Sequence, residues 1–309
     1  MTVEFQVPLP APLDIAGSLE LFRRSGDDLI DRWDGVELIR AVPAGQTWAP
    51  FVATACARVE APAFTVRIEA AQRTEQVRDA VATTFVPAQG DYARLLREDA
   101  VLARLDVRCP GIRQIRQLDL FTALVRCISA QQVNLRWAVI TRRRLAETFG
   151  TRHQVAGKVV YALDPRRIAL VDPAEIRALQ FTTSKAVSLV ATAQAVVNDN
   201  LTAENLAGLS DDQVISELVR IKGIGRWSAE WVLARTLGRP RVVAGDLGVR
   251  KAVGLAYLST PAPAEAEVRA ATAHWGESAG TAQALLLHAL GEGALSAPVR
   301  PESRAAPRR

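Results

Sequence analysis

Two glycines that flank one aliphatic residue, Gly223-Ile-Gly225, connect two stretches with helical periodicity. The first stretch opens with the capping-box sequence Ser210-Asp-Asp-Gln213 and runs directly into the glycines. The second carries Trp227 and Trp231. So short a connection must turn sharply, and glycine reaches backbone conformations that other residues avoid. The sequence therefore predicts a tight helix-hairpin-helix unit over about residues 210–237.

Such a hairpin is suited to hold a phosphate group with its backbone. At Gly223 and Gly225 no side chain separates the backbone from a ligand, and the first N–H groups of the next helix lack intrahelical acceptors. A DNA phosphate would fit there without any reading of base sequence. Arg226, Arg250 and Lys251 add positive charge. An ordinary glycine-rich turn between two packed helices is the alternative that these residues leave open.

Composition narrows the class of protein. The 309 residues predict two or three domains, and the net charge of +5 permits a nucleic-acid partner. The three cysteines, Cys56, Cys109 and Cys127, form no CxxC pair, which excludes a zinc site or a four-cysteine iron–sulfur cluster. We find no secretory signal and no apolar run of membrane-spanning length. We therefore expect a cytoplasmic protein, associated with the nucleoid if it is bacterial.

The hydrophobic pattern changes character along the chain and predicts the α+β fold class. Residues 1–90 contain short β-branched or alternating segments separated by turn signals, so we expect a small antiparallel sheet with one or two helices. These segments are Leu19–Phe22, Val36–Val42, Phe51–Val59 and Phe64–Ile68. Residues 91–293 read as helices almost throughout. Residues 294–309 are rich in Pro, Ala and Arg, which predicts a disordered tail.

A single acid, Asp246, stands at the start of a predicted helix, after the loop Arg239–Gly245. Its simplest role is that of a helix N-cap, which stabilises a helix by about 1 kcal/mol. A carboxylate at this place could also act on a ligand held by the hairpin. Because the two roles are compatible, the residue type and its position alone do not separate them.

Taken together, Ile221–Ala229 and Ala244-Gly-Asp246 resemble the helix-hairpin-helix, Gly/Pro-rich loop and aspartate (HhH-GPD) of DNA base-excision glycosylases. Within that superfamily the chain is similar to the 3-methyladenine DNA glycosylase II branch, which acts in alkylation repair. The resemblance covers most of residues 105–290, and Ile128–Val133 also fits the branch. It implies an all-α, two-lobed glycosylase core. For residues 1–90 it implies a half TATA-binding-protein-like sheet.

The resemblance implies that Asp246 is the catalytic aspartate. Cleavage of an N-glycosidic bond builds positive charge on the deoxyribose, which a carboxylate stabilises while it activates a water molecule. An alkylated purine is already cationic and leaves readily, so a second acid is not required, unlike in O-glycosidases. Bifunctional members carry a lysine two residues after the second hairpin glycine. Here that position is Trp227, which predicts hydrolysis without β-lyase activity.

The resemblance also implies a pocket for a flipped base, with Trp227, Trp231 and Trp275 as aromatic walls. It assigns Gln132 as the side chain that intercalates into the gap left by that base. Core packing is the alternative for each tryptophan, and a solvated loop amide is the alternative for Gln132. The stretch Trp275–Gln283 lacks the Pro and the Arg-Ser pair usual in this branch, which leaves the substrate range open.

The resemblance also implies a monovalent or hard cation at the hairpin, held by the backbone carbonyls of Val219, Ile221 and Ile224. We expect no other cofactor. The whole pattern predicts a monomeric, monofunctional glycosylase that excises alkylated bases, such as 3-methyladenine and 7-methylguanine, from duplex DNA in base excision repair. Two alternatives stay open. One is a non-catalytic, structure-selective DNA-binding protein, and the other is a glycosylase for deaminated or oxidised bases.

Overall fold

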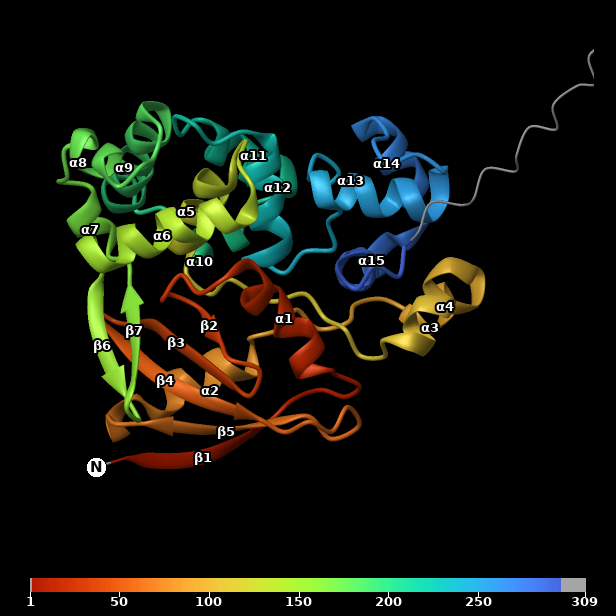
Figure 1. Ribbon diagram of the computed structural model, residues 1–309, viewed down its shortest axis with the longest axis horizontal. Coiled ribbons are helices and arrows are strands. Elements are labelled where there is room, and N and C mark those ends of the chain that lie inside the picture. The colour runs from red at the N-terminus through yellow and green to blue at the C-terminus, as the bar shows by residue number, and fades with distance from the viewer. Residues whose placement is uncertain (1, 296–309) are drawn as a thin grey trace, which may run out of the picture.

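The computed structural model describes residues 2–295, so the predicted tail from residue 296 onward lies outside the described residues. An antiparallel five-stranded sheet forms one end of the molecule, and helices form the rest (Figure 1). The strand order is β1-β5-β4-β3-β2. The strands are β1 Val3–Pro8, β2 Arg32–Trp33, β3 Glu37–Ala44, β4 Thr47–Ala55 and β5 Ala63–Ile68.

The two faces of the sheet bury different cores because successive side chains in a strand point to opposite faces. Leu38 of β3 and Phe51 of β4 belong to one cluster with helices α1 (Ile15–Ser25) and α2 (Thr74–Ala82). The neighbours of those two residues, Ile39 and Val52, belong to another cluster. This arrangement explains why the strand around Val36–Val42 is apolar on both sides instead of alternating.

One predicted strand is wrong, since Leu19–Phe22 lies within helix α1. Asp14 caps this helix by accepting a hydrogen bond of 2.9 Å from the backbone N–H of Gly17. Ile15 and Leu19 then fall on one helix face and are buried. A four-residue segment such as Leu-Glu-Leu-Phe fits both helical and strand periods, and the cap upstream decides between them.

The helical region forms two hydrophobic clusters. The first joins α5–α12 and the second joins α3, α4 and α13–α15, which agrees with the expected two-lobed core. The helices after residue 90 are α3 Tyr92–Glu98, α4 Ala100–Arg108, α5 Leu120–Ala130, α6 Leu135–Phe149, α7 Pro165–Ile168, α8 Pro173–Ala178, α9 Thr183–Asn198, α10 Ala203–Ala207, α11 Asp211–Val219, α12 Arg226–Arg235, α13 Leu247–Val253, α14 Glu265–Thr272 and α15 Ala279–Gly291. Among residues 2–295, no helix combines the length and apolarity that crossing a membrane would require.

A two-stranded hairpin interrupts the helices, which corrects the expectation of an all-α region. Its strands are β6 Thr151–Val155 and β7 Lys158–Ala162. The hairpin reaches down to the sheet (Figure 1), where Val155 and Val160 pack with Ile39 and Val52. The hairpin therefore covers the second face of the sheet. The residues against which it packs lie far away in the sequence.

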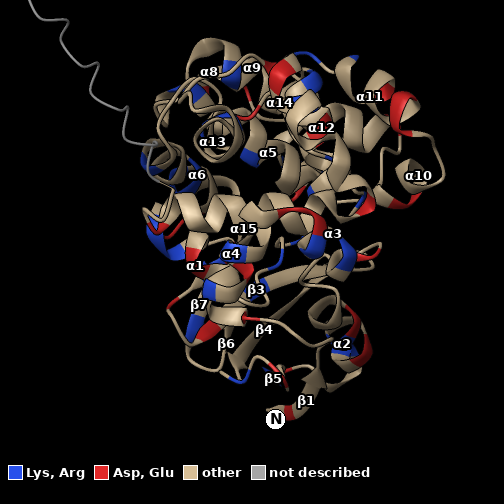
Figure 2. Ribbon diagram, turned by 90° about the vertical axis from the view of Figure 1, so that its right-hand side faces the viewer, with Lys and Arg blue, Asp and Glu red and all other residues tan. Residues whose placement is uncertain are grey.

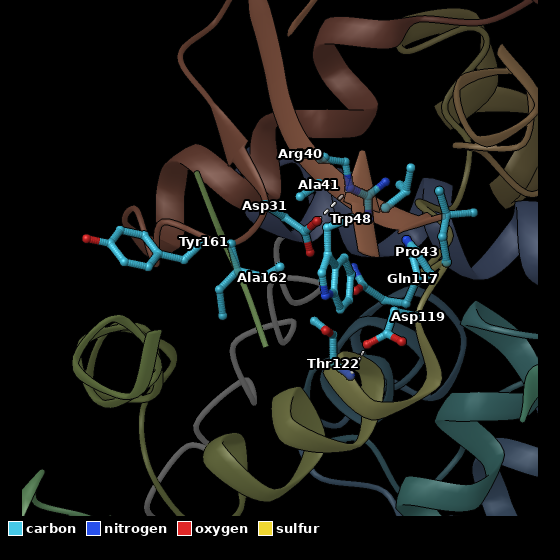
Figure 3. A pocket seen from close by; sticks show the side chains of 13 residues that line it. Asp31, Arg40, Ala41, Pro43, Trp48, Gln117, Asp119, Thr122, Tyr161 and Ala162 are labelled. Atoms are coloured by element: carbon cyan, nitrogen blue, oxygen red, sulfur yellow. Dashed lines mark hydrogen bonds and ion pairs between the residues drawn. The ribbon is translucent and has the colours of Figure 1, made fainter. Parts of the chain in front are cut away.

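A small cavity of about 20 Å³ lies between strand β3 and the start of α5. Figure 3 shows Asp31, Arg40 and Asp119 in its wall. Arg40 forms a buried ion pair of 2.5 Å with Asp31, and Asp119 caps α5 by accepting from the backbone N–H of Thr122. The volume suits about one water molecule and excludes a nucleobase.

Candidate functional site

A larger cavity, of about 360 Å³, lies where the N-terminal part meets the two helical clusters. Its size falls within the range of small-molecule sites. Helices α1, α5, α6, α12 and α15 and the start of α13 line it. Its apolar and aromatic lining includes Leu21, Phe22, Leu135, Val139, Trp227, Trp231, Leu287 and Leu290. Its charged lining residues are Asp28, Asp31, Arg126, Arg142, Arg235 and Asp246.

Asp246 lies in the cavity wall as the N-cap of α13. Its Oδ1 accepts hydrogen bonds from the backbone N–H groups of Gly248, at 2.8 Å, and Val249, at 3.0 Å. Its Oδ2 accepts from the indole Nε1 of Trp227 at 3.3 Å. The two carboxylate oxygens therefore have different partners. One oxygen holds the helix, and the other belongs to the side of the carboxylate that contacts Trp227.

Helix α12 contributes three cavity residues at intervals of four, Trp227, Trp231 and Arg235, which share one helix face. The guanidinium carbon of Arg235 lies 5.3 Å from the centre of the Trp231 ring, a cation–π contact. Burial lowers the pKa of Arg235, and the negative charge of Asp246 partly opposes that shift. The sequence reasoning missed Arg235, although the four-residue spacing that selects the two tryptophans also reaches it.

Three ion pairs join the N-terminal part to helices α5 and α6 beside the cavity, and a fourth lies within the N-terminal part. Arg126 contacts Asp28 at 3.0 Å and Asp31 at 2.7 Å, Arg142 contacts Asp28 at 2.9 Å, and Arg40 contacts Asp31. Burial alone would raise the pKa of each aspartate, but the neighbouring arginines lower both pKa values below the usual range. These acids come from the loop after α1 and had no signal in the sequence, because their partners Arg126 and Arg142 lie about a hundred residues away.

Trp275 does not line the cavity, contrary to the expectation of a third aromatic wall. It is 2% exposed and belongs to the second helical cluster, with its ring centre 6.1 Å from that of Tyr257. The core alternative therefore describes this tryptophan. It lies on the short 3₁₀ segment Ala273–Ser278, which packs against α3 and α15 and brings the ring into that core.

The hairpin glycines have different surroundings. Gly223 has φ +86°, and a Cβ built on it would lie 1.9 Å from the Oγ of Ser188 on α9. Gly225 has an extended backbone with φ −105°, and a Cβ there would meet no atom within 4 Å. Gly223 is thus required by the fold. The open space at Gly225, at the start of α12, leaves room for a ligand to approach the first N–H groups of that helix.

The turn between α5 and α6 lies against the hairpin. Gln131 donates from Nε2 to the carbonyl oxygen of Gly223 at 2.9 Å. Its neighbour Gln132 is exposed and has φ +55°, a conformation that non-glycine residues adopt less often. The structure therefore brings the residue predicted to intercalate close to the residue predicted to hold phosphate.

The three basic side chains predicted to contact phosphate differ in exposure and in their hydrogen bonds. Arg226 is exposed next to the hairpin, although its Nε donates to Glu230 at 3.1 Å. Arg250 is half-buried and its Nε donates to the carbonyl of Pro263 at 2.8 Å, whereas Lys251 is exposed.

The carbonyls predicted to hold a cation lie at the end of α11 and in the turn that follows. The carbonyl of Ile221 accepts from the N–H of Ile224 at 3.0 Å and retains a second lone pair. A hard cation requires oxygen ligands of this kind. The carbonyl chemistry at Val219, Ile221 and Ile224 therefore fits such an ion.

Three comparisons with known proteins bear on the family and the fold of this chain. The family model described as HhH-GPD superfamily base excision DNA repair protein matches residues 125–278. Two curated relatives from Bacillus subtilis are each 28% identical to this chain. One of them, named DNA-3-methyladenine glycosylase, aligns with 60% of this chain and 62% of its own length. The chain spans less than two thirds of the length of either relative.

Among solved structures, a 3-methyladenine DNA glycosylase from Archaeoglobus fulgidus has a TM-score of 0.80 at 21% identity, with 93% of this chain and 98% of that chain covered. A Clostridium acetobutylicum 8-oxoguanine glycosylase/lyase, solved in complex with double-stranded DNA, has a TM-score of 0.71 at 17% identity, with 95% and 98% covered. At these identities the likeness shows the fold, and it confirms the predicted fold class. The chain belongs to the HhH-GPD superfamily of base excision DNA repair proteins, and the curated relatives that it matches include proteins named DNA-3-methyladenine glycosylase.

Proposed function

We propose that this protein is a monofunctional DNA glycosylase that excises alkylated bases from duplex DNA, acting as a monomer in base excision repair. The observation that carries the proposal is the position of Asp246. Its carboxylate lies in the wall of a cavity of about 360 Å³ and contacts Trp227, a residue in the first turn of the helix after the glycine hairpin. A cavity of this size accommodates one extruded base.

In the proposed reaction the damaged base leaves the duplex and enters the cavity, with Trp227 and Trp231 in the walls. The C1′–N bond breaks with its electron pair going to the base, and positive charge develops on the deoxyribose. The carboxylate of Asp246 stabilises that charge, and it accepts a proton from the water molecule that bonds to C1′. The products are the free base and an abasic site.

The DNA contact depends on particular backbone groups. In the view of Figure 2, Lys and Arg are mixed with Asp and Glu over both the sheet and the helices, so we assign no general basic face. We assign the phosphate contact to the backbone at Gly223 and Gly225, with Arg226, Arg250 and Lys251 as supporting charges. In this proposal Gln132 fills the gap left by the extruded base. A cation at the carbonyls of Val219, Ile221 and Ile224 would further neutralise the bound phosphate.

The absence of lyase activity is part of the proposal. A lyase step needs an amine that attacks C1′ and forms a Schiff base. Trp227 occupies the position of that lysine, and within residues 2–295 no lysine lines the cavity. The DNA strand should therefore remain intact after base release until alkali is added.

The test compares the wild-type protein with Asp246→Asn under single-turnover conditions. The substrates are duplexes that hold one 7-methylguanine, one 3-methyladenine, one hypoxanthine or one 8-oxoguanine. Asn retains a side-chain oxygen for the cap, so the fold should persist. We expect release of the alkylated bases to fall by a factor of about 10² to 10³, a range typical of losing electrostatic stabilisation at a reacting centre. DNA affinity should be kept.

The rival proposals predict other results. A non-catalytic DNA-binding protein would bind these duplexes without accelerating base release, and Asp246→Asn would change nothing. A glycosylase for deaminated or oxidised bases would release hypoxanthine or 8-oxoguanine and leave 7-methylguanine and 3-methyladenine in place.

A further inference from the structure

The backbone of the loop that leads into Asp246 has few hydrogen bonds. Within residues 2–295, the main-chain groups of residues 240–245 form one hydrogen bond that reaches a distant segment, from the N–H of Val243 to the Oε1 of Gln283 at 2.8 Å. The carbonyl of Val243 accepts from the N–H of Asp246 at 2.9 Å. Val243 therefore connects Gln283 to the backbone of the proposed catalytic acid.

Gln283 is one of two buried glutamines that form a chain of hydrogen bonds. It lies on α15, and both it and Gln114, from the segment between α4 and α5, are buried. The Nε2 of Gln283 donates to the Oε1 of Gln114 at 3.3 Å. The Nε2 of Gln114 donates to the carbonyl of Ala234 on α12 at 2.8 Å. The chain of hydrogen bonds thus runs from α12 through two side chains to Val243.

The groups at the two ends fix the orientation of both amides. A backbone N–H only donates and a backbone carbonyl only accepts, whereas a side-chain amide does both. The N–H of Val243 requires the oxygen of Gln283, which leaves the Gln283 NH₂ group for the oxygen of Gln114. The Gln114 NH₂ group then faces Ala234. An apolar side chain in place of Gln283 would leave the buried N–H of Val243 without this acceptor, which is costly.

The chain of hydrogen bonds joins the two elements that set the position of Asp246. Helix α12 carries Trp227, whose indole donates to the Oδ2 of Asp246. The loop through Val243 sets the backbone position from which the carboxylate extends. Position matters because misplacement of a reacting group by about 1 Å can lower a rate about a hundredfold, even when its cause lies away from the chemistry.

We propose that Gln283 is a positioning residue for Asp246, and that Gln114 orients the amide of Gln283 for this role. The inference rests on the proposed function, in which Asp246 acts on the sugar. Neither glutamine lines the cavity, so both act through the backbone of Val243 and not on the base. Their effect should therefore be the same for every base that the protein releases.

The experiment measures single-turnover release of 7-methylguanine from a duplex at increasing protein concentration. It gives the maximal rate constant and the protein concentration at half of that maximum. Gln283→Met keeps the size of the side chain and removes the acceptor. We expect its maximal rate constant to fall about tenfold or more, while the half-saturating concentration stays within about twofold of wild type.

Gln283→Glu tests whether the acceptor oxygen matters. Its carboxyl retains an oxygen for Val243, and in the protonated form it also retains a donor for Gln114. Burial favours the protonated form of a carboxyl. The maximal rate constant relative to wild type should therefore exceed that of Gln283→Met, and it should rise as the pH is lowered from about 8 to about 6. If Gln283→Glu is as slow as Gln283→Met at every pH, the inference is wrong.

The matched control is Gln194→Met, the same exchange on α9. Gln194 donates to the carbonyl of Ala169 at 3.2 Å and does not line the cavity, so its substitution should leave the maximal rate constant unchanged. A merely structural role for Gln283 would lower the folded fraction. The half-saturating concentration of Gln283→Met would then rise while its maximal rate constant stayed at the wild-type value, and that result overturns the inference.

A second variant covers the case in which Gln283→Met does not fold, as judged by thermal unfolding. Gln114→Met leaves the bond from Val243 to Gln283 but removes the group that orients the Gln283 amide. Its maximal rate constant should fall about threefold or more, and an unchanged value would contradict the inference. The two proposals fail in distinguishable ways. If the wild-type protein releases no damaged base, the proposed function fails. If it releases bases and the glutamine variants match its maximal rate constant, only the role of Gln283 is wrong.

Discussion

The indole Nε1 of Trp227 donates a hydrogen bond of 3.3 Å to the Oδ2 of Asp246. This contact joins the first turn of the helix after the glycine hairpin to the cap of α13. It therefore connects the element proposed to hold DNA with the carboxylate proposed to act on the sugar.

Removal of this donor should affect catalysis more than binding. In Trp227→Phe the aromatic wall remains but Asp246 loses the hydrogen bond that orients its Oδ2. A hydrogen bond to a charged group contributes about 1.5–3 kcal/mol, so the single-turnover rate should fall by a factor of about 10 to 100. Trp137→Phe, outside the cavity, is the control. An unchanged rate in Trp227→Phe would show that the contact does not position the carboxylate.

The two hairpin glycines should respond differently to alanine. Gly223→Ala places a Cβ against Ser188 at a positive φ, so we expect it to destabilise the fold by about 2–4 kcal/mol in urea unfolding. Gly225→Ala meets open space at an ordinary φ and should unfold within about 0.5 kcal/mol of the wild-type protein.

The same two variants separate the effect of the hairpin on stability from its effect on DNA binding. In Gly225→Ala the added methyl group stands where we propose that the phosphate approaches, so the Kd for duplex DNA should rise about tenfold in a fluorescence-anisotropy titration. Full DNA affinity in this variant would argue against the hairpin as the phosphate site.

Acid should remove part of the stability through Asp31. Its pKa is lowered in the folded protein, because the attraction of Arg40 and Arg126 exceeds the effect of burial. A group with a lowered folded pKa contributes stability above its unfolded pKa of 3.8, and that contribution is lost as the pH falls toward the folded value. Asp31→Asn should therefore cost about 3–5 kcal/mol at pH 7, and the difference from the wild-type protein should shrink below about pH 4.

Urea unfolding at several pH values between 3 and 7 checks this expectation. Glu60 is exposed and forms no ion pair within the described residues, so Glu60→Gln is the control and should follow the wild-type curve. A constant gap between Asp31→Asn and the wild-type protein at every pH would mean that the ion pairs do not account for the pH dependence.

Gln132 and Gln131 should have separable effects. Gln132→Ala removes the side chain proposed to replace the extruded base, so base release should fall about tenfold, with little change in the free energy of unfolding. Gln131→Ala breaks the 2.9 Å contact to Gly223 and should weaken DNA binding by loosening the turn against the hairpin. Equal behaviour of both variants in release and binding assays would contradict these distinct roles.

Local sequence signals predicted the helix starts well. Ser210 and Asp246 both cap the helices predicted to start there, because capping depends on a side chain and backbone groups within three residues. The strand predicted at Leu19–Phe22 was wrong, because a segment of four residues fits both the helical and the strand period. The hairpin β6–β7 was missed for a related reason. Its stability depends on Ile39 and Val52, more than a hundred residues away in the chain.

By itself, the sequence determined the glycine hairpin, the helix cap at Asp246 and the presence of Trp227 where bifunctional members carry a lysine. Each of these depends on residue type and short spacing. Only the tertiary structure decided what surrounds Asp246. It placed Trp275 in a core, brought the acids Asp28 and Asp31 to the cavity and set Arg235 against the ring of Trp231 in the cavity wall. Burial and the pairing of charges depend on which distant segments pack together, and local patterns do not encode that information.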